Sequence, residues 1–350
     1  MTHAVARLGR AGTAVLTCEA GRGGTLSILR HATSDRPSLT RQGGPSEAAG
    51  TVLRDLLTQA KAPGGLILVL PGGVAAPRRI EVNLPVGGLI THSVLDEGIG
   101  RARDAVATPG TAVLSCRPAT YVLDGKTVPD AMGRKGRDLT LDLIALTAPI
   151  AILSAFDAAV RSAGARLDGV IPAEEAAAAA FLPSGEGVAI HLGYGDCVMV
   201  RATDDGLTAA ARVPIGRRHL EQDVAQAFGM TDGAAARVDR VLSGRPDDEA
   251  EKVIAARLEE LDDLLQEAAT RAGVPTGTSA VISGLPANAL RSWRGEASVP
   301  SAMPSELARD PLLAGGGFIV SGLRGSRDRA VAKLPTPNRP GLLDWLKERF

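Results

Sequence analysis

Three stretches of this 350-residue sequence combine residue types that could do chemistry. Gly125-Lys126-Thr127 has the ending of a phosphate-binding loop, but Thr120 stands where the leading glycine belongs, which favours a hairpin turn. His191 and Cys197 could supply a base and a thiol nucleophile, yet their places in adjoining strands favour packing or turn positions. The acidic run 249–267 has the i,i+4 charge pairs of a solvated helix face. None of the three predicts an enzyme.

The composition narrows the class of protein. Positive and negative side chains balance at 39 each, which excludes the global basic field of a nucleic-acid-binding protein. Hydrophobic residues make up 45% and aromatic residues 3%, so we expect a folded protein with an aliphatic core. The three cysteines and five histidines are scattered, and we expect neither a disulfide framework nor a metal site.

No segment has the pattern of a membrane span or a signal peptide. The uncharged run Leu143–Phe156 contains Pro149 and is too short to cross a bilayer. Near the N-terminus, Arg7 and Arg10 interrupt the apolar residues that a signal peptide would need. The body of the protein is therefore expected to be soluble.

Alternating and β-branched residues predict the elements that position these candidates. In the first half we expect strands at 13–17, 25–31, 66–70 and 167–171, with helices over 46–61 and from Pro149 to Ala163. Between them lies a small inserted α+β block with strands at 78–83, 111–116, 119–123 and 139–145 and a helix that starts near 91–93. In the second half we expect two strands within 188–202, strands at 207–213 and 279–283, and helices over 219–228, 231–242 and 247–272.

The two halves share a short repeat. When the segment Arg7–Leu16 is set against His191–Val200, apolar positions and a Leu-Gly pair coincide. The two segments are separated by roughly half the chain, which is what a duplicated, two-lobed fold requires. The match is short, so it carries weight only together with other signals.

Several segments, in order, resemble the bacterial actin-like cell-division protein FtsA. Asp130–Leu139 looks like the family segment that closes its characteristic inserted subdomain. Gly164–Pro172 with the alanines 176–180 look like the family's next stretch, a Gly-rich lead into an apolar strand and an alanine-rich helix. Gly187–Gly195 then stand where the family has its second phosphate-binding hairpin. Val213-Pro214-Ile215-Gly216 and Asp223-Val224-Ala225 are similar to two further family motifs. The resemblance implies an α/β, two-lobed actin-like fold with an FtsA-type inserted subdomain.

The chain departs from this family in the residues of the nucleotide-binding site. Actin-like ATPases begin each phosphate hairpin with Asp-x-Gly, whose carboxylates organise Mg²⁺ and the attacking water. Here Arg7 and His191 occupy the acidic positions, Tyr194 adds bulk in the second turn, and the adenosine-side glycine cluster is reduced to Gly284 and its neighbours. The degenerate nucleotide site would consist of Arg7, Gly9, Arg10, His191, Gly193, Tyr194, Gly195 and Gly284. We expect no ATP hydrolysis and no cofactor, with ATP and Mg²⁺ disfavoured.

The resemblance also implies a domain plan. A first lobe would comprise 1–77 and 152–186, with the inserted subdomain at 78–151. A second lobe would comprise 187–215 and 275–323, with a helical subdomain at 216–274. A basic, proline-containing linker would cover 324–340, and an amphipathic helix 341–350.

The C-terminal segment has the pattern of a membrane anchor. Residues 324–350 carry seven positive and three negative side chains, a net charge of +4, and three prolines fall within the stretch from Leu334 to Pro340. On a helix, the last ten residues would gather an apolar side rimmed by cations. The predicted membrane-binding residues are Leu342, Leu343, Trp345, Leu346, Lys347, Arg349 and Phe350.

The sequence therefore predicts a scaffold resembling FtsA that tethers FtsZ filaments to the inner face of the cytoplasmic membrane at the division site. Its expected partners are the FtsZ C-terminal tail, an anionic membrane surface, further copies in actin-like filaments, and other division proteins at the inserted subdomain. Three alternatives stay open: a nucleotide-binding, polymerising ATPase, a PilM-like assembly platform for a pilus or secretion system, and a cytosolic binding module with no lipid dependence.

Overall fold

The computed structural model divides the chain into two units. It describes residues 1–22, 25–40, 43–182, 185–203, 206–230, 232–275, 277–286, 288–297, 304–323 and 331–332. The first unit comprises 1–173 and the described residues from Gly316 onwards, and the second comprises 174–315. The domain plan expected from the sequence differs at two segments, since it places 174–186 in the first lobe and 316–323 in the second.

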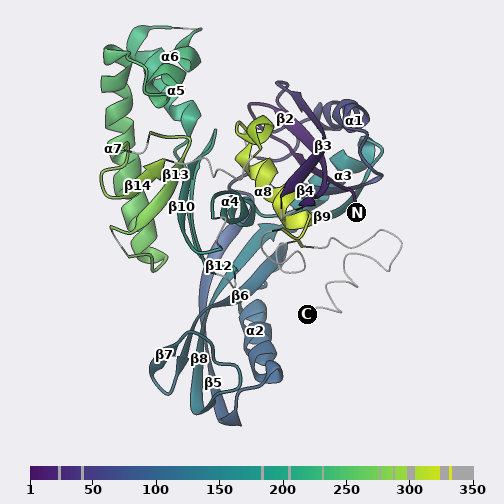
Figure 1. Cartoon of the computed structure of the whole chain (residues 1–350), viewed down its shortest axis with the longest axis vertical. Coiled ribbons are helices and arrows are strands. Elements are labelled where there is room, and N and C mark those ends of the chain that lie inside the picture. Colours follow the sequence, from purple (N-terminus) through teal and green to yellow (C-terminus); the bar gives the residue numbers. More distant parts are fainter. Residues whose placement is uncertain are drawn as a thin grey trace. The chain divides into compact units, whose positions relative to one another are not determined.

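The first unit is built on a five-stranded sheet of order β3-β2-β1-β4-β9 (Figure 1). Its strands are β1 (His3–Arg7), β2 (Thr13–Ala20), β3 (Leu26–Ser34), β4 (Gly65–Val69) and β9 (Arg166–Ile171). The first three run antiparallel, while β4 and β9 lie parallel to β1. Leu66, Leu68 and Val69 are fully buried, as expected for a central parallel strand that is covered on both faces.

The helices beside this sheet include α1 (Ala49–Gln59), α3 (Ile150–Ser162) and, from Gly316 onwards, α8 (Pro311–Val320). A Cβ at Gly316 would lie 2.6 Å from a methyl of Val69 and 2.9 Å from one of Val5. The glycine therefore lets α8 approach the sheet at β1 and β4 closely.

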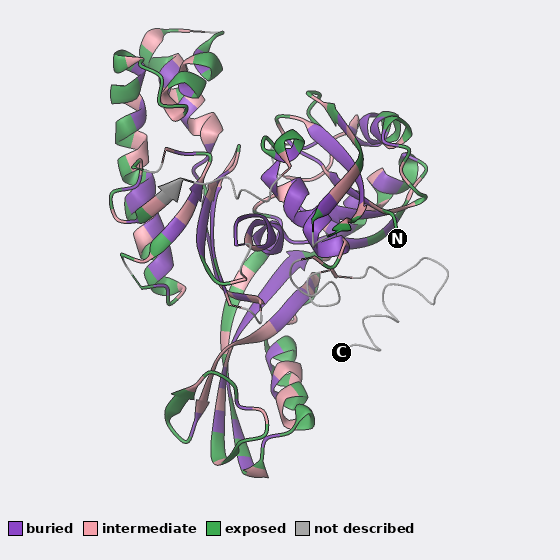
Figure 2. Cartoon of the chain, viewed as in Figure 1, coloured by how far each residue is buried: buried purple, intermediate pink, exposed green. Residues whose placement is uncertain are grey.

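The second unit repeats this arrangement with the order β12-β11-β10-β13-β14. Its strands are β10 (Gly187–Leu192), β11 (Cys197–Thr203), β12 (Gly206–Val213), β13 (Ser279–Ser283) and β14 (Arg294–Ala297). Its helices are α4 (Ala173–Phe181), α5 (Arg217–Phe228), α6 (Ala234–Leu242) and α7 (Asp248–Arg271), with a short 3-10 helix at Ser305–Leu307. Figure 2 shows exposed residues along the outer side of α7 and buried residues along the strands of this sheet.

The repeat predicted from the sequence is confirmed by strand register. Arg7 pairs with Ala14 across the first hairpin and His191 pairs with Val198 across the second, so a single shift along the chain relates both pairs. On the other side, Arg7 pairs with Val69 and His191 with Ser283. Arg7 and His191 thus stand at equivalent points of two like sheets.

An α+β subdomain is inserted into the first unit between β4 and α3, as expected. It consists of β5 (Ala76–Leu89), α2 (His92–Val106), β6 (Thr111–Leu123), β7 (Lys126–Val128) and β8 (Lys135–Pro149). The strands form an antiparallel sheet of order β5-β8-β6-β7, and α2 packs on it (Figure 1). Asp124 and Gly125, both with positive φ, form the turn between β6 and β7. The expected hairpin is confirmed there, and the phosphate-loop interpretation is excluded.

Several sequence predictions about elements are wrong in detail. The two strands expected at 111–116 and 119–123 are one strand, β6, whose register shifts between Val113 and Ser115 and again between Pro118 and Thr120. Pro149 caps α3 in an extended conformation and does not lie in its first turn. No strand was predicted at β1, β7 or β14, and no helix at α8.

Candidate functional site

The first glycine turn joins β1 to β2 through residues 8–12, in the first unit. Arg7 ends β1, and its Nη1 lies 2.9 Å from the point that a Cβ on Gly9 would occupy. The guanidinium therefore covers Gly9. Arg7 and Arg10 both have interaction partners, so neither is a free cation.

Ser38 closes this turn from inside. The Gly9 N–H donates to Ser38 Oγ at 3.3 Å, and the Ser38 N–H donates to the Gly9 carbonyl at 3.0 Å. The Ser38 hydroxyl also bonds the hydroxyl of Thr13, and both residues are buried. A phosphate-binding turn needs unengaged amide donors. In this turn the Gly9 amide is already used.

The second glycine turn, in the second unit, joins β10 to β11 through residues 193–196. The Gly193 N–H donates to the Asp196 carbonyl at 2.8 Å. The carbonyls of Gly193 and Tyr194 accept the N–H groups of Arg217 and Arg218, both at 2.9 Å. These two N–H groups belong to the first turn of α5, where backbone N–H groups have no carbonyl acceptor within the helix. The turn and the helix start thus satisfy each other.

Of the remaining residues predicted for the second turn, His191 and Gly284 lie where two strands end. His191 Nδ1 is 3.4 Å from Ser283 Oγ, and its ring centroid is 5.3 Å from that of Phe181. A Cβ on Gly284, which has φ of +79°, would lie 2.6 Å from the Leu192 carbonyl. Tyr194 is exposed at the tip of the turn and Gly195 follows it.

Cys197 does not complete a nucleophile pair with His191. It pairs with Leu192 in the hairpin register, and it is fully buried. Burial raises the pKa of its thiol far above the ordinary value, and Asp196 adds to that effect. A thiol in this state is unreactive.

Sequence reasoning missed Glu174, a buried carboxyl at the start of α4. Its side chain is 1% exposed, and neither oxygen reaches a hydrogen-bond donor on another described residue. Burial raises its pKa from 4.5 to about 7, helped by Asp196 and Glu175 and opposed by Arg212. Arg212 also lies 3.7 Å from Asp196. Glu174 stands just before a run of alanines, which indicates a buried helix. That pattern is the sequence signal from which a buried carboxyl at this position could have been predicted.

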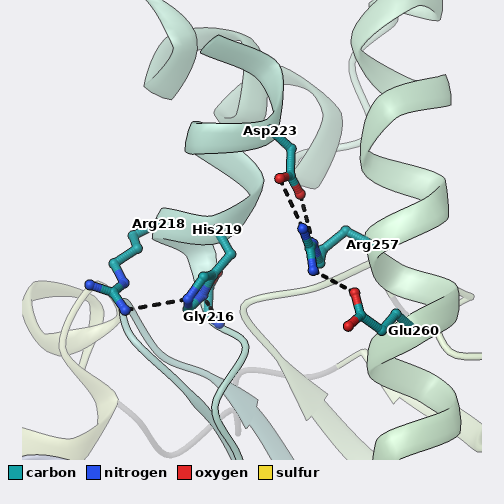
Figure 3. A network of polar contacts seen from close by, with 6 residues as sticks. All are labelled: Gly216, Arg218, His219, Asp223, Arg257 and Glu260. Atoms are coloured by element: carbon teal, nitrogen blue, oxygen red, sulfur yellow. Dashed lines mark hydrogen bonds and ion pairs between the residues drawn. The ribbon is translucent and has the colours of Figure 1, made fainter. Parts of the chain in front are cut away.

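Two clusters of polar contacts lie on α5, one at its start and one that joins the middle of the helix to α7 (Figure 3). His219 Nδ1 lies 2.9 Å from the Gly216 nitrogen and accepts its hydrogen bond, which satisfies the amide of the residue that caps α5, while Arg218 Nη2 lies 3.3 Å from Nε2. Asp223 accepts two hydrogen bonds from Arg257, at 2.7 and 3.0 Å. Desolvation and then Arg218 lower the pKa of His219. Asp223, found through a family motif, thus fixes α5 to α7.

The structure separates the predicted site residues into two groups. Arg7, Gly9 and Arg10 belong to the first unit, while His191, Gly193, Tyr194, Gly195 and Gly284 belong to the second. The predicted membrane-binding residues, 342–350, lie outside the described residues, as does most of the linker. Among the described residues, no cluster of His, Cys, Asp and Glu could hold a metal ion. No described helix combines the length and hydrophobicity needed to cross a bilayer.

Comparison with known proteins identifies the fold. No family model matches the chain, and no curated protein does. PilM, from a PilM-PilN type IV pilus biogenesis complex, superposes with a TM-score of 0.62 at 14% identity, over 92% of this chain and 98% of that one. The ethanolamine utilization protein EutJ from Carboxydothermus hydrogenoformans superposes with a TM-score of 0.52 at 12% identity, over 90% and 89%.

Identities this low establish the fold and do not single out FtsA among actin-like proteins. The repeated sheets and the superposition with PilM and EutJ agree with each other over nearly the whole chain. The fold class predicted from the sequence is confirmed: the chain has the actin-like ATPase fold.

Proposed function

We propose that this chain is a non-hydrolysing scaffold of actin-like fold, an assembly platform that binds a partner protein and is held at the inner face of the membrane by residues 341–350. The observation that carries the proposal is the superposition with PilM, which spans 92% of this chain and 98% of that one. PilM comes from a complex with PilN. A PilN-type protein is therefore the first partner to test.

The two glycine turns support a scaffold without ATP turnover. Neither has a carboxylate at its start, and each turn is closed by its own hydrogen bonds, through Ser38 in one and the start of α5 in the other. Magnesium-dependent hydrolysis needs acidic groups to hold the ion and orient water. The described residues offer no acidic cluster that could do so.

A division scaffold resembling FtsA is the second candidate, and the order of family-like segments favours it. The inserted subdomain lies between β4 and α3, where the FtsA resemblance predicts it. On this candidate the helical subdomain 216–274 receives the FtsZ tail. Self-association into filaments and contacts of the inserted subdomain with other proteins would suit either candidate.

Partner titration tests the proposal. The purified full chain is titrated separately with a PilN-type cytoplasmic segment and with the FtsZ C-terminal peptide, both from the same genome, and binding is followed by fluorescence anisotropy. We expect saturable binding of the first and none of the second. Saturable binding of the FtsZ peptide alone would replace the platform with the division scaffold, and binding of neither would reject both.

A thermal-melting experiment tests the expectation that the chain does not bind Mg-ATP. After exhaustive dialysis, the chain is heated with and without Mg-ATP. A ligand present at 100 times its dissociation constant stabilises the folded state by about 2.7 kcal/mol, which raises the melting temperature by several degrees. We expect no shift, which would reject the polymerising-ATPase alternative, whereas a saturable upward shift would show that the chain binds the nucleotide and would keep that alternative open.

A further inference from the structure

The outer strand of the first sheet holds a piece of the chain's own C-terminal segment. β9 ends the order β3-β2-β1-β4-β9, so one of its edges has no neighbouring strand within the sheet. Unpaired edges expose backbone donors and acceptors. At Val170 that edge is occupied, because the Val170 N–H donates to the Ala332 carbonyl and the Ala332 N–H donates back, both at 2.9 Å.

Gly169 makes room for this contact. A Cβ at position 169 would lie 2.6 Å from a methyl of Val331 and 3.0 Å from the Ala332 carbonyl oxygen. The three atoms nearest to that point all belong to Val331 and Ala332. A side chain at position 169 would therefore collide first with this segment of the chain.

The contact at Val331 and Ala332 lies between the body of the first unit and the proposed anchor, so it limits how far the anchor can lie from that unit. The body of the first unit is described as far as Leu323, after α8, and the chain returns to it at Val331 and Ala332. The proposed anchor begins at Gly341. An extended chain spans at most about 3.4 Å per residue, so the anchor can lie about 60 Å from Leu323 but about 30 Å from Ala332.

We propose that Val331 and Ala332 form a latch on β9 that fixes where the C-terminal tether leaves the first unit and halves its reach. The inference rests on the proposed membrane attachment. With the latch closed, the tether is the short segment 333–340, and the β9 edge of the first unit is held close to the bilayer. With the latch open, the body moves away from the surface and loses its fixed attachment point.

Two variants open the latch by different routes. Ala332→Pro removes one of the two N–H donors and leaves β9 unchanged. Gly169→Val places a side chain where Val331 lies and keeps both donors. Ala332→Ser retains the N–H and is the control for the first variant. Gly64→Val is the control for the second, because a Cβ at Gly64 meets no atom within 4 Å.

The first measurement uses the full chain in solution without lipid, and follows hydrogen exchange of the Val170 amide. We expect exchange about tenfold faster in Ala332→Pro and Gly169→Val than in wild type and both controls, which matches the loss of about one net hydrogen bond. Amides of β4 serve as an internal reference for an intact sheet. Equal exchange at Val170 in wild type and Ala332→Pro would overturn the latch.

The second measurement places the body above vesicles that contain anionic lipid. A donor dye is attached at Asp55→Cys, on the exposed side of α1, while the three native cysteines are buried. Energy transfer to a lipid-borne acceptor should be strong in wild type and the controls, and weaker in both latch variants. Equal transfer in all of them would overturn the inference. Altered exchange at Val170 without vesicle binding by any form would reject the membrane attachment and leave the latch standing.

Discussion

Arg7 and His191 occupy one position in two copies of a hairpin, yet different neighbours close the two turns. The sequence predicted both positions, because a Leu-Gly pair and apolar spacing mark them. It could not predict Ser38, which lies 29 residues from Gly9 and has no motif around it. It could not predict the bonds from the start of α5 either. Such hydrogen-bond partners are brought together only by the tertiary fold, so no local sequence pattern indicates them.

At Glu174 we predict a pH-dependent stability that the neutral variant lacks. A carboxyl whose pKa rises from 4.5 to about 7 on folding binds more protons in the folded state between those values. Its contribution is therefore fully present below pH 4.5 and is lost as pH rises through 7. The stability difference between wild type and Glu174→Gln should change by about 3 kcal/mol across this window.

Urea denaturation at a series of pH values measures this difference. Glu251→Gln is the matched control, because it makes the same substitution at an exposed position on α7. A difference between wild type and Glu174→Gln that stays constant from pH 4.5 to 8 would show that the Glu174 carboxyl is not perturbed in the folded protein.

His219 should have the opposite pH dependence. Its pKa is lowered on folding, so the unfolded chain binds more protons and stability falls as pH drops below about 6.5. His219→Gln keeps an acceptor for the Gly216 N–H but does not titrate. We expect wild type, and not this variant, to lose the α5 cap on acidification, seen as faster hydrogen exchange of the Gly216 amide. Equal exchange in the two proteins at every pH down to the onset of unfolding would contradict the prediction.

At the scale of elements, most strands and helices follow from alternation and helical spacing. β13 has the predicted bounds, and α1, α5 and α7 differ from their predicted bounds by one to three residues. α8 was missed because three consecutive glycines normally break a helix, and here Gly316 is required where the helix meets the sheet. β1 was missed because its apolar core is three residues long and histidine and arginine flank it. Propensity cannot detect elements that only packing requires.

Helix α2 provides a test of packing in the inserted subdomain. A Cβ on Gly98 would meet a methyl of Leu141, and one of Leu84 at 2.9 Å, whereas a Cβ on Gly100 meets no atom within 4 Å. Gly98→Leu should therefore overpack the contact and cost about 1–3 kcal/mol. Gly100→Leu should stabilise the helix by about 0.5–1 kcal/mol.

Thermal unfolding of the two variants beside wild type measures both effects. The two positions lie close together on the same helix, so the comparison separates packing against the sheet from helix propensity. Stabilisation by both substitutions would mean that α2 does not lie on the sheet as described.

At the scale of the whole molecule, the fold class was predicted from the order of the motifs and from the repeat that relates the two halves of the chain. The structure confirms the fold class and the repeat. Sequence could not decide among actin-like relatives, because the departures at Arg7 and His191 remove the residues that would classify the site. The partner therefore has to be found by binding.

Membrane attachment is the prediction that belongs to the full chain. Deletion of 341–350 should abolish co-sedimentation with vesicles that contain anionic lipid, since it removes the apolar side chains that would enter the lipid. Binding of the protein partner should be unaffected by the deletion. Undiminished co-sedimentation after the deletion would show that the last ten residues are not the anchor.

The place of α8 in the chain also has a consequence for synthesis on the ribosome. The second unit is one uninterrupted segment, 174–315, whereas the first needs residues from Gly316 onwards. Until α8 emerges, Val5 and Val69 lack the helix that covers them. Domains fold as units as they leave the ribosome. The half that is translated first is therefore the last to be completed, and a released chain that ends at Gly315 would contain the whole second unit but lack the part of α8 that the first unit needs.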